Sequence, residues 1–151
     1  MQNRLFFISF IPESNKFRGS LSFEAFNSEN NPQTLIKKAE TIYSEYIRRM
    51  RIQLNHLREL RVKKISIPVL NIWEIGNLIF ALKADLDKVG LQVDNLYSHL
   101  VRDLGVKRKW LEKVVILRRY ISCKKLIPKN IKWGSFEHST ARKAKDLGSH
   151  K

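Results

Sequence analysis

No glycine or proline interrupts the chain between Pro32 and Pro68, and this stretch restricts the fold more than any other feature of the sequence. Asn31 followed by Pro32 is a typical helix start, with an N-cap residue and a proline at the first helical position. We therefore expect one helix over residues 32–64, about 50 Å long at ~1.5 Å per residue. Its apolar residues recur at the three- and four-residue steps of one helix face; they are Ile36, Ala39, Tyr43, Tyr46 or Ile47, Met50, Leu54 and Leu57.

The other faces of this expected helix are basic. A helix longer than a small domain that has only one apolar seam usually packs against a partner helix. We therefore expect residues 32–64 to mediate homo-oligomerisation or to bind a partner protein. The helix also forms a secondary basic surface, whose residues are Arg48, Arg49, Arg51, Arg58, Arg61, Lys63 and Lys64.

Two short segments near the N-terminus have the character of β-strands. Residues 5–11 are aromatic and β-branched, and residues 20–25 alternate polar and apolar side chains. We expect an antiparallel hairpin, followed by a polar linker at residues 27–31. A lone two-stranded ribbon is marginally stable, so the hairpin has to pack on the helices or pair with another chain. The expected fold class is mainly α, formally α+β.

The rest of the chain predicts further helices. One begins after Ser66 and Pro68, runs to about residue 88, and is apolar nearly all round, as a buried helix is. Asp94 is the expected N-cap of the next helix, which Gly105 ends. Another follows from residue 107 to about 121, and then a short anchored helix and a frayed basic tail. The expected parts are a hairpin appendage (1–31), the long helix (32–64), a helical domain (65–140) and the tail (141–151).

Positive charge dominates the composition and is unevenly distributed. The formal net charge is +15, and residues 32–64 and 105–151 contribute +6 and +11, against 0 for 1–31 and −2 for 65–104. Such an excess usually serves a polyanionic partner, nucleic acid before membrane. One cysteine excludes an internal disulfide and fits a reducing compartment. Neither a membrane span nor a signal peptide is evident, so we expect a cytoplasmic location.

Residues 96–114 have the pattern of a helix-turn-helix, with Gly105 at the turn. The second helix is expected to bury Trp110, Leu111, Val114, Val115, Leu117 and Ile121. Its other face is cationic and suits phosphates and base edges. Together with the lysines that follow, the expected nucleic-acid-binding residues are Lys107, Arg108, Lys109, Lys113, Arg119, Tyr120, Lys124, Lys125, Lys129 and Lys132. Arg118 lies on the apolar side, either at the edge of the core or paired with Glu74.

Several motifs occur in an order that resembles a known family. They are Ile72-Trp-Glu-Ile-Gly-Asn-Leu-Ile79, residues 96–104, residues 111–120 and Ile131-Lys-Trp133. Over about residues 68–140 they resemble the N-terminal domain of the YhcG-like family, which precedes a PD-(D/E)XK nuclease domain. The resemblance implies DNA binding and assembly, as an adaptor or recognition component of a mobile-element or defence system. It also implies structural roles for Trp73, Gly76, Leu100, Leu104, Leu111, Tyr120 and Trp133.

The nuclease activity of that family is not carried over to this chain. The sequence stops where the nuclease domain would begin, and none of its acidic residues has lysine two positions later, as the PD-(D/E)XK motif needs. The four histidines show no ligand-like spacing, Cys123 is best explained as an incidental thiol, and no glycine-rich phosphate loop occurs. We therefore expect no enzyme activity, no catalytic residue, no metal and no cofactor.

The sequence thus predicts a non-catalytic DNA-binding protein. Two alternatives remain open. Because the same charges can contact either polymer, the chain could be an RNA-binding subunit of a ribonucleoprotein; duplex DNA is favoured because few exposed aromatic residues are available to stack on bases. The basic faces could also dock on an acidic protein.

Overall fold

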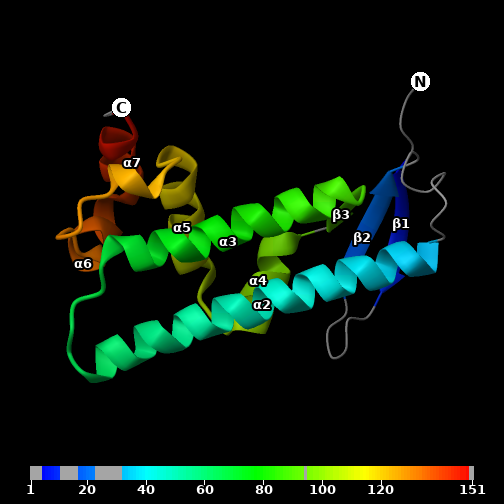
Figure 1. The fold of residues 1–151 in the computed structure, drawn as a ribbon, viewed down its shortest axis with the longest axis horizontal. Helices are drawn as coiled ribbons and strands as arrows, with labels where there is room; N and C mark the ends of the chain where they lie inside the picture. Colours follow the sequence, from blue (N-terminus) through cyan, green and yellow to red (C-terminus); the bar gives the residue numbers. More distant parts are fainter. Residues whose placement is uncertain (1–4, 11–16, 23–31, 94, 150–151) are drawn as a thin grey trace. The chain divides into compact units, whose positions relative to one another are not determined.

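The computed structural model describes the backbone of residues 5–10, 17–22, 32–93 and 95–149 (Figure 1). Side chains are described for Thr34 and for residues 37–90 and 95–149. The elements in chain order are β1 (Leu5–Phe10), β2 (Phe17–Ser22), α2 (Pro32–Val62), α3 (Val69–Lys88), β3 (Leu91–Val93), α4 (Leu96–Leu104), α5 (Arg108–Tyr120), the 3-10 turn η1 (Lys124–Leu126), α6 (Trp133–Phe136), the 3-10 turn η2 (Glu137–Ser139) and α7 (Thr140–Ser149).

The long helix predicted from the sequence is confirmed as α2, which begins at Pro32 and ends two residues earlier than expected. Its end is closed by two backbone hydrogen bonds, from Lys64 N–H to Arg61 O (3.0 Å) and from Ile65 N–H to Leu60 O (2.8 Å). Lys64 has φ 58°, the left-handed conformation that commonly follows a helix. The expected N-cap, Asn31, lies outside the described residues.

The three helices expected between residues 66 and 121 are present as α3, α4 and α5. Gly105 has φ 66° and its N–H donates to Val101 O (3.0 Å), so the predicted left-handed turn is confirmed. The cap of α4 differs from the expectation, because Asn95 holds that position with φ 53° and makes no side-chain cap bond. Residue 94 itself lies outside the described residues.

The chain forms two compact units that are not continuous in sequence. Unit 1 comprises residues 1–48 and 80–105, and unit 2 comprises residues 49–79 and 106–151. The division passes through α2 and α3 and falls between Gly105 and Val106. Because α4 belongs to unit 1 and α5 to unit 2, the packing of these two helices as a helix-turn-helix stays a prediction.

Unit 1 has a helical core with two buried tyrosines from α2. Tyr43 donates a hydrogen bond to the carboxylate of Asp103 in α4, whose side chain is only 2% exposed and also contacts Arg102 (3.1 Å). Tyr46 donates to Asp85 in α3 (2.6 Å). These bonds satisfy polar groups that would otherwise cost free energy on burial. The apolar residues buried with the tyrosines are Ala39, Ile47, Leu82, Leu86, Leu100 and Leu104.

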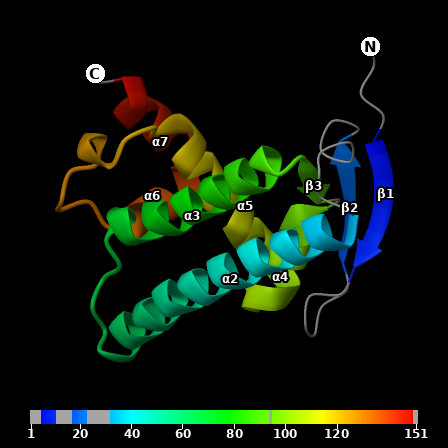
Figure 2. The ribbon, with the colours of Figure 1, turned by 45° about the vertical axis from the view of Figure 1, so that its right-hand side comes forward.

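Three short strands also belong to unit 1 and pair antiparallel in the order β1-β2-β3 (Figure 2). Leu5 lies opposite Ser22, and Gly19 lies opposite Ile8 on one side and Val93 on the other. The side chains of these strands and the connection 11–16 lie outside the described residues, so the hairpin appendage stays a prediction. The α+β class is corrected, because all described buried side chains lie on helices or on the connections between them. The fold is mostly helical.

Unit 2 has its own core, built by the second half of α2, the first half of α3, α5 and the C-terminal segment. Its fully buried large side chains are Met50, Ile72, Ile75, Ile79, Leu111, Leu117 and Ile121. The expected burial is therefore confirmed for Leu111, Val114, Val115 and Leu117 of α5 and for Ile121 just after it, whereas Trp110 is only half-buried.

The C-terminal residues differ from the expected frayed tail. Residues 140–149 form α7, which lies beside α5 in both views (Figures 1 and 2). Ala144 and Thr140 of α7 are buried, and the Thr140 hydroxyl donates to Phe136 O (3.1 Å). The basic extension is thus part of the packed unit up to Ser149.

Candidate nucleic-acid interface

The net positive charge of the chain resides in one unit. Unit 2 contains 20 Lys and Arg against 5 Asp and Glu, whereas unit 1 contains 9 of each. The whole formal charge of +15 therefore belongs to unit 2. Because opposite charges balance within unit 1, the net positive electrostatic field of the chain originates in unit 2.

Helix α5 supplies the centre of the predicted interface. Its sequence places apolar side chains on the buried side and leaves Arg108, Lys109 and Arg119 exposed, with Lys113 half-buried. Lys107, which precedes the helix in an extended conformation, is exposed as well. The exposed face of α5 is therefore cationic, with Glu112 as its one acidic residue.

Close packing against α3 fixes the position of α5. At Gly76, an added Cβ would lie 2.8 Å from Arg118 Cβ and 2.9 Å from the Val114 carbonyl oxygen, so only glycine fits without displacing the backbone of α5. Three residues earlier, the buried Trp73 donates its indole N–H to the carbonyl of Ile121 (2.8 Å), just after α5 ends. The cationic helix is thus held by a rigid support.

Arg118 connects the same two helices through a polar contact. Its Nε donates to Asn77 Oδ1 (3.0 Å), and its guanidinium lies 5.4 Å from the centre of the Trp73 ring. Of the two placements predicted for Arg118, the pairing with Glu74 is corrected in favour of Asn77, three residues further along α3, and the half-buried side chain agrees with the edge of the core. Partial burial lowers the pKa of Arg118 from its ordinary value, yet an arginine stays charged at neutral pH.

The segment after α5 holds four more predicted contact residues. Ile121, Ile127 and Trp133 are buried and anchor it. Backbone bonds tie it to the start of α3, from Val69 N–H to Ile131 O (3.0 Å) and from Trp133 N–H to Ile67 O (2.7 Å). Between these anchors the side chains of Lys124, Lys125, Lys129 and Lys132 are exposed.

Helix α7 covers the end of α5 and changes the role expected for Tyr120. Gly148 lies against the Tyr120 carbonyl so closely that an added Cβ would overlap it, and Lys145 Nζ lies 5.0 Å from the centre of the Tyr120 ring. Tyr120 as a whole residue is 36% exposed. Tyr120 is therefore engaged by α7 and is less available to a base than an open aromatic side chain.

Most of these cations have no carboxylate partner among the residues that the structure describes. For Lys107, Lys109, Lys113, Arg119 and the four lysines of 124–132, the described residues offer no carboxylate within 4 Å. Arg48 of the secondary basic surface differs, because its bond to Glu45 (2.6 Å) raises the pKa of Arg48 and makes a neutral pair in unit 1. The other members of that surface belong to unit 2 and are exposed.

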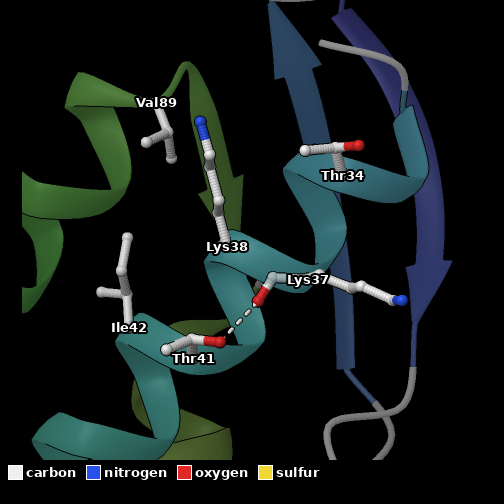
Figure 3. Close-up of a pocket in the computed structure, with 6 residues that line it drawn as sticks. All are labelled: Thr34, Lys37, Lys38, Thr41, Ile42 and Val89. Atoms are coloured by element: carbon white, nitrogen blue, oxygen red, sulfur yellow. Dashed lines mark hydrogen bonds between the residues drawn. The ribbon is translucent and has the colours of Figure 1, made fainter.

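Other kinds of site find little support in the structure. Among the described residues, no three His, Cys, Asp or Glu side chains gather in a way that could hold a metal ion. Cys123 is exposed. A surface hollow of about 390 Å³ in unit 1 lies between α2 and Val89 (Figure 3). In this hollow the Thr41 hydroxyl donates to the Lys37 carbonyl (2.9 Å). The residues that line the hollow bring no group suited to catalysis.

The described part of the chain has no helix that is both long and apolar enough to cross a bilayer.

Two features of the structure, one in each unit, were missed from the sequence. Helix α7 was missed because its one glycine resembles a helix breaker and its apolar residues are few, although Thr140, Ala144 and Leu147 recur at helical steps. The tyrosine–aspartate bonds of unit 1 also escaped prediction, although Tyr43 and Tyr46 on an apolar helix face implied that each hydroxyl needed a partner.

Comparison with protein-family models, with curated proteins and with solved structures finds no match for this chain. The family resemblance described from the sequence therefore rests on its quoted residues alone.

Proposed function

We propose that this chain binds nucleic acid without catalysis, and that unit 2 binds the phosphate backbone of duplex DNA. The observation that carries the proposal is the charge separation, with 20 basic against 5 acidic residues in unit 2 and equal numbers in unit 1. Cations of like sign repel one another and destabilise a folded chain. A bound polyanion neutralises them, and the counterions that it releases on binding contribute favourable free energy.

Duplex DNA is favoured over single-stranded RNA for a second reason. Single strands are usually bound by aromatic side chains on which the bases stack. Among the described residues, Tyr120 is the one Phe, Tyr or Trp residue that is exposed, and Lys145 lies against its ring. A surface of lysines and arginines without stacking platforms suits the regular phosphates of a duplex.

A pair of charge-matched variants tests the proposal. In the α5 variant, Arg108, Lys109, Lys113 and Arg119 are replaced by alanine; in the control variant, Lys37, Lys38, Lys83 and Lys88 of unit 1 are replaced. Both lose four positive charges, so the net charge of the molecule falls equally. We expect the α5 variant to bind a fluorescent duplex roughly 100-fold more weakly, because each lost phosphate contact removes a counterion-release contribution. The control should bind within about twofold of the unmodified chain.

The result that contradicts the proposal is equal affinity of both variants. A parallel titration with RNA of the same sequence distinguishes the polymers, since tighter binding to RNA would favour the ribonucleoprotein alternative. Absence of binding to either polymer at moderate salt would leave the acidic protein partner as the better explanation.

A further inference from the structure

The last two residues of α2 and the first four after it, residues 61–66 and called the α2–α3 turn here, combine exposed charge with exposed apolar side chains. Val62 is 83% exposed and Ile65 49% exposed, although aliphatic side chains of this size are usually buried. Arg61, Lys63 and Lys64 within the turn are exposed, and so is Arg58, about one helical turn before it. The described residues place no carboxylate within 4 Å of these four cations.

The backbone of this turn is fixed and not merely a loose connection. Ile65 N–H bonds to Leu60 O (2.8 Å) and Lys64 N–H to Arg61 O (3.0 Å), which is the double closure of a Schellman motif. Lys64 occupies the left-handed position of this motif, with φ 58°. Glycine is the usual residue there, because a side chain makes that conformation unfavourable. A lysine at this position is strained, and strain of this kind often accompanies function.

We propose that this turn is a second contact for duplex DNA, separate in sequence from α5. The four cations bind phosphates, and Val62 and Ile65 pack against the deoxyribose edge of a groove. Charge complementarity selects the partner: the turn belongs to unit 2, where the net charge of the chain resides. The inference rests on the proposed function and adds a second binding element to it.

Lys64→Gly tests the turn without the risk of unfolding the protein. Glycine relieves the left-handed strain, so the Tm should stay the same or rise, while the lost cation should weaken duplex binding about fivefold at ~150 mM salt and reduce the salt slope by about 0.9. Asn95→Gly is the matched control, because Asn95 has φ 53° but is uncharged and lies in unit 1. It should leave the affinity unchanged.

The apolar pair is tested with Val62→Ser/Ile65→Ser. Loss of packed aliphatic groups should weaken duplex binding about tenfold and leave the salt slope as it was. Ile52→Ser is the control, since Ile52 is 54% exposed on α2 of the same unit but lies more than two turns from the α2–α3 turn. It should bind as the unmodified chain does.

The outcomes separate this inference from the proposed function. If the α5 variant loses affinity while Lys64→Gly and the double serine variant bind normally, the turn is not a contact and the proposed function stands. If the unmodified chain binds no duplex, both fail. A Lys64→Gly variant that loses Tm along with affinity also overturns the inference. The inference is also overturned if the unmodified chain binds phosphatidylglycerol vesicles through Val62 and Ile65, while the double serine variant binds duplex DNA as tightly as the unmodified chain.

Discussion

Raising the salt concentration from about 50 mM to about 200 mM should weaken binding of this chain to duplex DNA a thousandfold or more. A protein that contacts six to ten phosphates loses roughly 10³–10⁵ in affinity over this range, because added salt opposes the release of condensed counterions. Nine of the predicted contact residues carry a positive charge, Lys107 just before α5 and eight in or after it, and they are enough to reach that number of contacts. Fluorescence anisotropy at several salt concentrations gives the slope of log affinity against log salt.

The slope also measures how much of the cationic surface meets the DNA. A slope near −6 or steeper is expected, at about −0.9 per phosphate. The α5 variant should have a slope shallower by about 3.6, and the unit 1 control variant should keep the slope of the unmodified chain. A slope shallower than about −2 for the unmodified chain would mean that two or fewer phosphates are neutralised. That result is incompatible with binding by the whole interface.

The second large effect concerns the support of α5. Trp73→Ala should lower the free energy of unfolding by about 3–5 kcal/mol, because it removes a large buried side chain and leaves a cavity between α3 and the end of α5. It also leaves the Ile121 carbonyl without its 2.8 Å partner and Arg118 without the ring beside it. Since small domains are stable by only about 5–15 kcal/mol, urea denaturation followed by circular dichroism should show a much lower midpoint.

Trp73→Phe is the matched control for this prediction. Phenylalanine keeps most of the apolar volume but cannot donate to Ile121, so the expected loss is smaller, about 1–2 kcal/mol. If Trp73→Ala changes the free energy of unfolding by less than about 1 kcal/mol, the contact between α3 and the end of α5 is not important for stability. The rigid support argued for the cationic helix would then be wrong.

Local signals in the sequence predicted helices α2 to α5 well. Pro32 marks the start of α2, and Gly90 and Gly105 follow the ends of α3 and α4 with the left-handed backbone that glycine permits. The buried and exposed sides of α5 followed from the helical period, so the exposure of Arg108, Lys109 and Arg119 could be anticipated. These features depend on residues close together in the chain.

Features that depend on contacts between residues far apart in the sequence could not be predicted from local signals. The partner of Arg118 is decided by the crossing of α3 and α5, which brings Asn77 within reach in place of Glu74. Helix α7 contains few apolar residues and is stabilised by packing on α5, where Gly148 permits the close approach to Tyr120. The division into two units was hidden because α2 and α3 run through both of them.

The central claim is that the cations of unit 2, and not those of unit 1, meet the DNA. Lysine acetylation of the unmodified chain, with and without saturating duplex, tests it at individual residues by mass spectrometry. Bound DNA should protect Lys107, Lys109, Lys113, Lys124, Lys125, Lys129 and Lys132 from the reagent, while the exposed Lys37, Lys38, Lys83 and Lys88 react at unchanged rates. Equal protection of both sets, or protection of the unit 1 lysines alone, would contradict the account.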